Sequence, residues 1–394
     1  MDYLKTSFGF RLRKVVRYLA LYGPGRTWEK VRAQHHMRTV YGDTSTPDRP
    51  ARTTARIGIV GCGAFAYSTI AYYLRREENG GIRATMDVDL NRARSLGERA
   101  RATYWTTDVR RLLNDADISL VYIASNHSTH APYAVAALER GKHVHIEKPP
   151  VVDEEQLRNL VVAMSRSAGG VQLGYNRPVS HLGRRLLEAL AKEQGPTVMN
   201  WFVAGHAIEP EHWYFSPSEG GRVLGNLCHW IDFTFQAIPR ECRWPLRIVP
   251  ARADRSDCNV AVSYVFQDGS VGVVSFSAMG HTFDGVKERC SVQKGHTLIT
   301  LDDFRIMVVD VAEKKTTVRL RYRDHGHQAA IRRSLDLLRT GKAGGVTPEY
   351  VWETGLLMMR TKAALESGRE VVLDAPREYT DLVRGNVPAS ADHP

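Results

Sequence analysis

A short glycine turn at residues 61–63 carries the first chemical signal in this 394-residue sequence. The apolar residues 57–60 before it predict a buried parallel strand. Residues 64–76 after it have helical spacing, with the small Ala66 at the third position of a Gly-x-Gly-x-x-(Gly/Ala) pattern. A strand, a glycine turn and a helix N-terminus form a cradle whose backbone N–H groups meet a pyrophosphate. The predicted pyrophosphate contacts are Gly61, Gly63, Ala64 and Phe65.

An acidic residue about twenty positions later completes such a unit, because it binds the ribose hydroxyls of the dinucleotide. Asp87 fits this role, since it ends the next predicted strand at residues 82–87. A carboxylate there would repel the 2′-phosphate of NADP. We therefore expect NAD as the cofactor, while the nearby Arg92 leaves NADP open.

Lys148 is the strongest candidate for a catalytic side chain. It follows the predicted strand 143–146 at the carboxyl edge of the parallel sheet, where ligands bind in such folds. Next to Glu147 and held by Pro149, its amine could donate to a substrate hydroxyl that becomes a carbonyl. Partial desolvation would bring the pKa of this lysine toward the range in which proton transfer is efficient. We predict that Lys148 moves the proton.

These motifs together resemble the Gfo/Idh/MocA family, named for glucose–fructose oxidoreductase, inositol 2-dehydrogenase and a rhizopine-catabolism protein. Five features in the family's order carry the resemblance over roughly residues 55–375. They are Gly61-Cys62-Gly63-Ala64-Phe65-Ala66, Asp87 with Asp89, the run from Ala124 to His130, Glu147-Lys148-Pro149, and Gly220-Gly221 followed by His229 and Asp232. The resemblance implies an NAD(P)-dependent oxidoreductase with the proton-transfer role on the lysine. The further cofactor contacts that it implies are Ser125, Asn126, His127, His130, Glu147 and Lys148.

His229 is the second catalytic candidate, on a helix predicted over residues 222–237. Asp232 follows one turn later and would orient its imidazole. In many relatives an aspartate precedes this histidine by four residues, whereas this chain has Gly225 there, followed by Asn226. Because an amide cannot titrate, we expect Asn226 to position a sugar hydroxyl. The proton step then falls to the lysine and the histidine.

Further substrate contacts are predicted where the last parallel strand, residues 170–174, leads into the second half of the chain. Tyr175, Asn176 and Arg177 should face the cleft. The planar guanidinium of Arg177 suits a substrate carboxylate or phosphate, and equally an interdomain salt bridge. Trp213 belongs to a loop rich in aromatic and imidazole rings, which suits a sugar ring and, equally, packing under a long loop.

The order of predicted elements indicates an α/β protein. Strands alternate with helices over 55–174, which predicts a Rossmann domain with a doubly wound parallel sheet. Two-periodic runs over 175–380 predict a substrate-binding and oligomerisation α+β domain with a large, mostly antiparallel open sheet, followed by a tail at 381–394. The predicted strands are 56–60, 82–87, 118–123, 143–146, 170–174, 196–205, 246–251, 258–266, 271–278, 285–293, 296–301 and 304–310.

Residues 1–54 predict a basic helical extension and a linker. Of the formal net charge of +11, about +8 lies in residues 1–56, from twelve Lys and Arg against four Asp and Glu. An i, i+3, i+4, i+7 pattern from Leu12 to Leu19, with basic residues between, predicts an amphipathic helix. Residues 8–38 could pack on the protein body or a neighbouring subunit, or contact an anionic membrane surface or an acidic partner. No recognised nucleic-acid fold accompanies the charge, so we expect no nucleic-acid partner.

Composition is that of an ordinary globular protein, with 43% apolar and 25% charged residues. The five cysteines form no C-x-x-C pair, which argues against a zinc site or a disulfide framework and suits a cytoplasmic protein. The histidines show no metal-ligand spacing, so no metal is expected. As the resemblance implies, we expect a homodimer or homotetramer.

The expected function is hydride transfer between nicotinamide and a secondary alcohol or ketone of a carbohydrate, plausibly a nucleotide-linked or acidic sugar. One alternative is a lyase, epimerase or glycoside-cleaving enzyme that oxidises its substrate transiently and retains NAD. A second alternative is a non-catalytic dinucleotide-binding regulator or scaffold, for which the missing aspartate argues and the retained Lys148 argues against.

Overall fold

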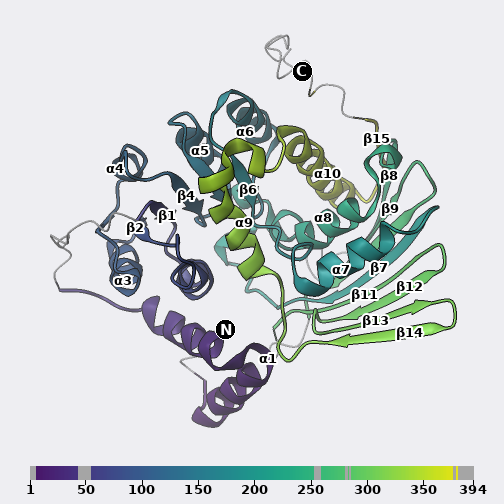
Figure 1. The fold of residues 1–394 in the computed structure, drawn as a ribbon, viewed down its shortest axis with the longest axis horizontal. Helices are drawn as coiled ribbons and strands as arrows, with labels where there is room; N and C mark the ends of the chain where they lie inside the picture. Colours follow the sequence, from purple (N-terminus) through teal and green to yellow (C-terminus); the bar gives the residue numbers. More distant parts are fainter. Residues whose placement is uncertain are drawn as a thin grey trace.

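The computed structural model describes residues 6–42, 55–252, 259–279, 283, 285–375 and 379. Within these residues the chain is built on two β-sheets (Figure 1). Residues 43–54 of the predicted linker 41–54, the predicted tail 381–394 and Cys258 lie outside the described residues.

The first sheet has six parallel strands in the order β3-β2-β1-β4-β5-β6, a doubly wound arrangement. The strands are β1 (Ile57–Val60), β2 (Ile82–Met86), β3 (Tyr104–Thr106), β4 (Leu120–Ile123), β5 (His143–Ile146) and β6 (Val171–Leu173). The predicted parallel sheet is therefore confirmed. Strand β3 was not predicted, because three residues are too short to show a periodic pattern.

Helices connect these strands, and several begin at an aspartate whose carboxylate accepts from a backbone N–H of the first turn. Asp89 accepts from Asn91 N at 3.0 Å, and Asp153 accepts from Gln156 N at 2.8 Å. The helices are η2 (Ala66–Ile70), α2 (Ala71–Leu74), α3 (Leu90–Ala100), α4 (Val109–Leu113), α5 (His127–Leu138) and α6 (Glu154–Arg166). The element η2 is a π-helical turn that continues into α2.

The second sheet has nine strands in the order β14-β13-β12-β11-β7-β10-β9-β8-β15, and every neighbouring pair is antiparallel except β7 with β10. This confirms the predicted large, mostly antiparallel sheet. The strands are β7 (Thr197–Ala204), β8 (Leu246–Arg252), β9 (Asn259–Val265), β10 (Val271–Ser277), β11 (Lys287–Lys294), β12 (Thr297–Asp302), β13 (Ile306–Val311), β14 (Lys314–Arg319) and β15 (Val371–Leu373). Alternation along β7 buries Trp201 and exposes Phe202, so one face of the sheet is covered and the other is open.

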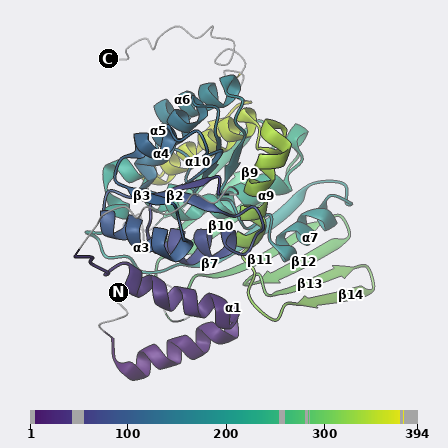
Figure 2. The same cartoon turned by 60° about the vertical axis from the view of Figure 1, so that its left-hand side comes forward.

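The covered face packs against helices from the second half of the chain (Figure 2). These helices are α7 (His181–Leu190), α8 (Cys228–Ala237) and α10 (Pro348–Ser367). Helix α9 (His327–Thr340) instead packs on β4, β5 and β6 of the parallel sheet, where Ser334 Oγ lies 2.6 Å from His145 Nδ1. The short helical turns are η3 (Trp213–Phe215), η4 (Pro217–Glu219), η5 (Val223–Leu227), η6 (Arg240–Cys242) and η7 (Gly341–Gly344).

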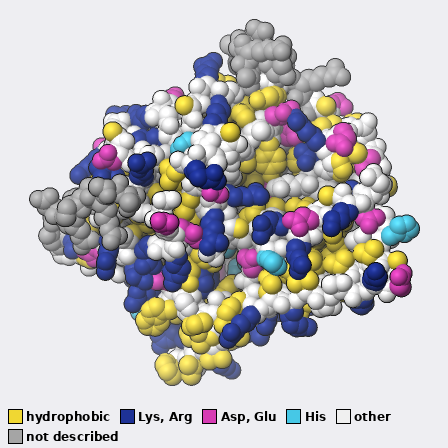
Figure 3. All heavy atoms as spheres, viewed as in Figure 1, with side chains coloured by type: hydrophobic (Ala, Val, Ile, Leu, Met, Phe, Trp, Pro, Cys, Tyr) yellow, Lys and Arg dark blue, Asp and Glu magenta, His cyan; other side chains and the backbone are white. Residues whose placement is uncertain are grey.

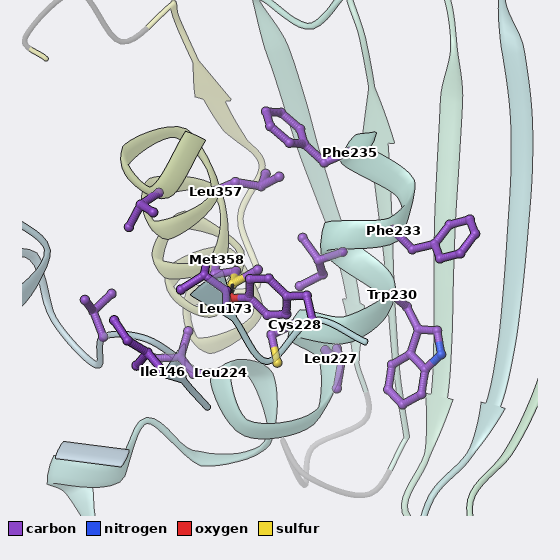
Figure 4. Close-up of a cluster of buried hydrophobic side chains, with 14 of the residues drawn as sticks. Ile146, Leu173, Leu224, Leu227, Cys228, Trp230, Phe233, Phe235, Leu357 and Met358 are labelled. Carbon is purple, nitrogen blue, oxygen red and sulfur yellow. Dashed lines mark hydrogen bonds between the residues drawn. The ribbon is translucent and has the colours of Figure 1, made fainter. Parts of the chain in front are cut away.

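One continuous apolar core joins the two sheets. Figure 4 shows Cys228 of α8 beside Met358 of α10 and Leu173 of β6, whereas Trp230 and Phe233 point from the other side of α8 toward the nine-stranded sheet. Trp230 is 1% exposed, and its indole Nε1 donates to Glu288 Oε2 at 2.7 Å. Because α8 is held on both sides, the position of His229 on it is set by the core.

Helix α1 (Phe8–His36) is bent at Gly23, whose φ of 77° and ψ of 170° are not helical, and Pro24 follows. Its two arms form a hairpin beside the parallel sheet (Figures 1 and 2). The second arm packs on that domain, where the buried Arg26 donates to Thr69 Oγ1 at 3.1 Å and Glu29 pairs with Arg75 at 3.3 Å. This agrees with the prediction that the extension packs on the protein body.

The first arm of α1 presents its apolar stripe to solvent. Leu12, Val16 and Leu19 are 53%, 58% and 40% exposed, whereas Lys14 and Leu21 on other faces of the helix are buried. Figure 3 shows this stripe as a hydrophobic patch at the lower edge of the molecule, with Lys and Arg side chains beside it. None of the described helices combines the length and the apolarity needed to cross a membrane.

Candidate active site

A cleft of about 630 Å³ lies at the carboxyl edge of the parallel sheet, in the size range of small-molecule sites. The loops after β1, β2, β4 and β5 reach it, because parallel strands end at one edge. The predicted site residues that line it are Gly61, Gly63, Ala64, Phe65, Asp87, Ser125, Asn126, His127, His130, Glu147, Lys148, Asn176, Arg177, Trp213 and His229.

The two glycines of the turn are required for different physical reasons. Gly61 has φ of 87°, and a Cβ there would lie 2.5 Å from the backbone of Ala124 and Ser125, so a side chain cannot be accommodated. A Cβ at Gly63 would meet nothing within 4 Å and would project into open space. Since Gly63 lines the cleft, its missing side chain leaves room for a ligand to approach the backbone.

Asp87 holds the glycine turn as well as lining the cleft. Its Oδ2 accepts from Cys62 N at 2.7 Å, and its Oδ1 accepts from Asp89 N at 3.0 Å. Each carboxylate oxygen has a second lone pair that remains able to accept a ribose hydroxyl. Arg92 lines the same cleft and lies 3.3 Å from Asp89 Oδ2, so a cation is also within this part of the site.

Helix α1 supports the glycine turn from behind. His36 Nε2 donates to Cys62 O at 2.7 Å, while its Nδ1 lies 2.9 Å from Ser95 Oγ. Its ring stacks on Tyr67 with centroids 4.3 Å apart, and burial lowers the pKa of this imidazole. Met37 lines the cleft itself. The extension thereby contributes to the site, although no spacing pattern in the sequence links residues 36 and 37 to the glycine turn.

Lys148 lies on the loop after β5, with a cis peptide bond to Pro149. Its Nζ donates to Gly225 O at 2.8 Å, which joins the parallel-sheet domain to the turn before α8. An ammonium group has three donors, so this contact orients the amine and leaves two donors for a ligand.

His229 lines the cleft from α8, but Asp232 does not orient it. The Asp232 carboxyl group instead accepts from Tyr350 Oη and from Gln236 Nε2, and burial raises the pKa of this carboxyl to about 7. The buried Nδ1 of His229 has no hydrogen-bond partner among the described residues. Burial, followed by the charges of Arg177 and Lys148, lowers the pKa of His229, so its imidazole is neutral at pH 7. The expected histidine–aspartate pair was therefore wrong.

Tyr214 fills the space that an aspartate would need at position 225. A Cβ on Gly225 would lie 2.0 Å from Tyr214 Oη and 2.8 Å from His127 Cε1. Tyr214 lines the cleft, and its buried hydroxyl has no hydrogen-bond partner among the described residues. Burial raises the pKa of this phenol, so it is neutral at pH 7. The glycine at 225 and the tyrosine at 214 are therefore sterically coupled.

Two histidines after β4 connect loops of the site. His130 lies between two carbonyl groups, with Nδ1 2.8 Å from Pro149 O and Nε2 3.0 Å from Ser125 O. His127 Nδ1 donates to Glu219 O at 2.8 Å, and burial followed by the charge of Lys148 lowers its pKa to about 3. Both rings therefore fix the loops around the cleft. The rings of His127 and Trp213 also meet in a T-shaped contact, with centroids 5.1 Å apart.

Arg177 is engaged in a buried ion pair. Its Nε and Nη2 donate to the two carboxylate oxygens of Glu288 on β11, at 3.1 and 2.9 Å, and Nη1 donates to Asn176 Oδ1 at 3.1 Å. This geometry favours a salt bridge over a substrate anion, but the pair lies within the predicted domain 175–380 and does not join the two domains. The pair also fixes Asn176 at the wall of the cleft.

Two predicted substrate contacts do not reach the cleft. Tyr175 is buried and its hydroxyl lies 3.1 Å from Met358 Sδ, and Asn226 does not line the cleft. His327, at the start of α9, lines it instead and was not predicted, because it lies far along the chain from every cofactor motif. Among the described residues, no three His, Cys, Asp or Glu side chains are grouped as metal ligands would be.

The parallel sheet in this strand order, the glycine turn open to solvent at Gly63, and a carboxylate at the end of β2 together define a dinucleotide-binding Rossmann domain. Residues 55–175 match the GFO_IDH_MocA model, described as an oxidoreductase family with an NAD-binding Rossmann fold. This match identifies residues 55–175 as a Rossmann domain of the Gfo/Idh/MocA type, as the motifs predicted, and the predicted nicotinamide cofactor is confirmed.

Curated relatives match parts of the chain. The 1,5-anhydro-D-fructose reductase of Ensifer adhaerens is 34% identical over 229 residues, 54% of this chain and 62% of that protein. Inositol 2-dehydrogenase 3 of Saccharopolyspora erythraea is 35% identical over 127 residues, 32% of this chain and 37% of that protein. The chain thus spans between about one third and two thirds of the length of these relatives.

Solved structures share the fold over most of the chain. GenD2 from gentamicin A biosynthesis, in complex with NAD, has a TM-score of 0.71 at 19% identity and covers 84% of this chain and 100% of that chain. Levoglucosan dehydrogenase, in complex with NADH and levoglucosan, has a TM-score of 0.69 at 16% identity and covers 81% and 99%. The two-domain architecture therefore extends to these proteins.

Proposed function

We propose that the protein is an NAD-dependent oxidoreductase that interconverts a secondary alcohol and a ketone of a carbohydrate. The single observation that carries the proposal is that Lys148 and Gly63 line one cleft, so a proton-transfer group and a dinucleotide cradle face the same space. The names of the relatives, an inositol dehydrogenase and an anhydrofructose reductase, support a polyhydroxylated substrate.

The residues around the glycine turn fit NAD. The open space at Gly63 admits a pyrophosphate to the backbone, and Asp87 lies where the ribose hydroxyls of the adenosine half would bind. NAD bound there supplies the hydride acceptor, or NADH the donor. Ser125 and Asn126, on the loop after β4, border the space left for the nicotinamide half.

Lys148 transfers the proton in this proposal. During ketone reduction the ammonium donates a proton to the carbonyl oxygen as the hydride reaches the carbon. During alcohol oxidation the neutral amine accepts the hydroxyl proton. The contact to Gly225 O orients the amine for both directions.

His229 and Tyr214 complete the proton-transfer group. A neutral imidazole accepts a hydrogen bond from a substrate hydroxyl, and a neutral phenol donates one. Tyr214 occupies the space beside Gly225, so we assign it the positioning role that an aspartate has in many relatives. Trp213, 41% exposed beside it, offers an aromatic face to the sugar ring.

A substrate panel tests the proposal. We expect the NAD-loaded protein to change the nicotinamide absorbance with one class among cyclitols, anhydro sugars, uronic acids and nucleotide-linked sugars. We favour the nucleotide-linked or acidic sugars, because the lining of the neighbouring cavity is basic. Product formed without net absorbance change would replace dehydrogenation by transient oxidation. Intact NADH binding with no reaction of any substrate would contradict catalysis.

We also propose a homo-oligomer and a cytoplasmic location. The open face of the nine-stranded sheet exposes Val198, Phe202 and Leu298 by 47%, 57% and 41%, and a second copy would cover this apolar surface. The four described cysteines are unpaired, which is usual in a reducing compartment.

The first arm of α1 is proposed to bind an anionic membrane surface. Phe8, Leu12, Val16 and Leu19 form its exposed stripe, and exposed Arg13 is among the basic residues beside it. We expect the protein to co-sediment with phosphatidylserine-rich vesicles, and less so at high salt, because the apolar and the electrostatic contributions act together.

Leu12→Ser combined with Val16→Ser should reduce the affinity for the vesicles by about tenfold or more. Each of these aliphatic side chains would contribute about 1.5–3 kcal/mol to binding when it is buried in the membrane. Val372→Ser, which removes an equally exposed side chain on β15, is the matched control and should have no effect. Wild-type protein that ignores the vesicles, or a double variant that still binds them, would contradict the membrane assignment.

A further inference from the structure

A second cavity, of about 770 Å³, lies between α1 and the parallel-sheet domain. We propose that this cavity, hereafter the basic chamber, binds the phosphate groups of the substrate whose sugar occupies the cleft beside Lys148. The inference rests on the proposed function, and it names the substrate class as a phosphate-bearing sugar.

The charge of the chamber is the first argument. Its described basic lining residues, histidines aside, are Arg11, Lys14, Arg26, Lys30 and Arg323. The only carboxylate among the described lining residues is Asp324, whose two oxygens accept from the backbone N–H groups of His181 and Gly326 at 2.9 and 2.8 Å. Asp303, outside the lining, balances Arg323. Arg26 and Lys30 have no ion pair with a carboxylate among the described lining residues. Buried charges are normally compensated, so this part of the chamber is complementary to an anion.

Lys30 lies close enough to other cations of the chamber for their charges to act on its amine. Its Nζ lies over the rings of Tyr22 and Tyr18, at 5.0 and 5.7 Å from their centroids. Burial, followed by the charges of Arg26, Arg323 and Lys14, lowers the pKa of Lys30 to about 7. The neighbouring cations therefore create a positive electrostatic potential at Lys30, and a bound phosphate dianion would neutralise it.

The chamber adjoins the cleft. Ala64, Phe65 and His327 line both spaces, so one extended molecule can occupy the two. Phosphate groups in the chamber would then lie on the far side of these residues from Lys148. The chamber wall also carries five tyrosines, Tyr18, Tyr22, Tyr72, Tyr73 and Tyr322, whose flat faces suit a nucleoside base or a second sugar ring.

The test uses full-length protein saturated with NADH, so that the pyrophosphate cradle at Gly63 is already filled. Inorganic pyrophosphate and uridine 5′-diphosphate are titrated calorimetrically. We expect both to bind. Affinity for the nucleotide at least about tenfold above that for pyrophosphate would indicate a nucleotide-linked sugar, and equal affinity a simpler sugar phosphate.

Lys30→Gln should weaken pyrophosphate binding at least about tenfold, the usual contribution of a charged hydrogen bond. Arg13→Gln removes the same charge from an exposed position on the first arm of the same helix and should change the affinity less than about twofold. Unchanged NADH affinity in Lys30→Gln shows that the variant is folded.

If the NADH-saturated wild type did not bind pyrophosphate, or if both variants weakened pyrophosphate binding equally, the proposed phosphate site in the chamber would be refuted. The two proposals fail separately. Hydride transfer to an uncharged sugar without pyrophosphate binding would refute only the chamber, whereas pyrophosphate binding without hydride transfer to any substrate would refute only the oxidoreductase.

Discussion

Lys148→Ala is expected to lower the rate of single-turnover hydride transfer by about 10²–10⁴, the usual contribution of a general acid–base group. In the proposed binding mode the pyrophosphate and the ribose contact the glycine turn and Asp87, so NADH affinity should remain close to that of the wild type. Stopped-flow absorbance measures the rate, and fluorescence titration measures the affinity. Lys192→Ala, at an exposed lysine, is the control and should behave as the wild type.

Tyr214→Phe is the companion variant, because it removes one hydroxyl from the space beside Gly225. We expect a smaller loss of rate than with Lys148→Ala and a higher KM if this hydroxyl positions the sugar. Gly225→Asp cannot restore the aspartate of many relatives by itself, since its Cβ would meet Tyr214 Oη at 2.0 Å. A Lys148→Ala enzyme that reacts at the wild-type rate would refute the mechanism.

Gly63→Leu is expected to abolish measurable NADH binding while leaving the protein folded. A Cβ at this position meets no protein atom within 4 Å, and the backbone there is outside the left-handed region. The leucine side chain would instead occupy the space through which a pyrophosphate reaches the backbone. Fluorescence titration tests the binding, and thermal unfolding without ligand tests the fold.

Gly61→Leu is the contrasting variant. Its Cβ would lie 2.5 Å from the backbone of the loop after β4, and its φ of 87° disfavours a side chain, so we expect a lower Tm as well as lost binding. If Gly63→Leu bound NADH with wild-type affinity, the dinucleotide would have to approach the protein elsewhere.

Local patterns determined the fold class and the cofactor motif. A glycine turn between a buried strand and a helix is built from residues adjacent in sequence. The sequence could therefore predict that Gly61, Gly63, Ala64, Phe65 and Asp87 lie together at one cleft. The two sheets followed from the same kind of information, because strand periodicity is set by neighbouring residues. Short strands such as β3 and β15, of three residues each, carry too little of that pattern.

The position of the N-terminal extension depended on tertiary structure. Periodicity predicted an amphipathic helix with an apolar face from Leu12 to Leu19 and left open what this face contacts. The structure buries a different face of α1, because Arg26, Glu29 and His36 on the second arm find partners on the parallel-sheet domain. An apolar stripe in the sequence indicates that one face of a helix favours burial, but it does not identify the surface that buries this face.

The roles of the polar side chains were decided by contacts between distant segments. Asp232 lies one helical turn after His229, yet its hydrogen-bond partners are Gln236 and Tyr350. Arg177 is paired by Glu288, 111 positions away in the chain. The sequence alone identified which residues could do chemistry near the cleft, since residue type fixes donors and charges. Only the tertiary structure determined which of them remain available to a ligand. The others are buried away from the cleft or already bonded to residues from distant parts of the chain.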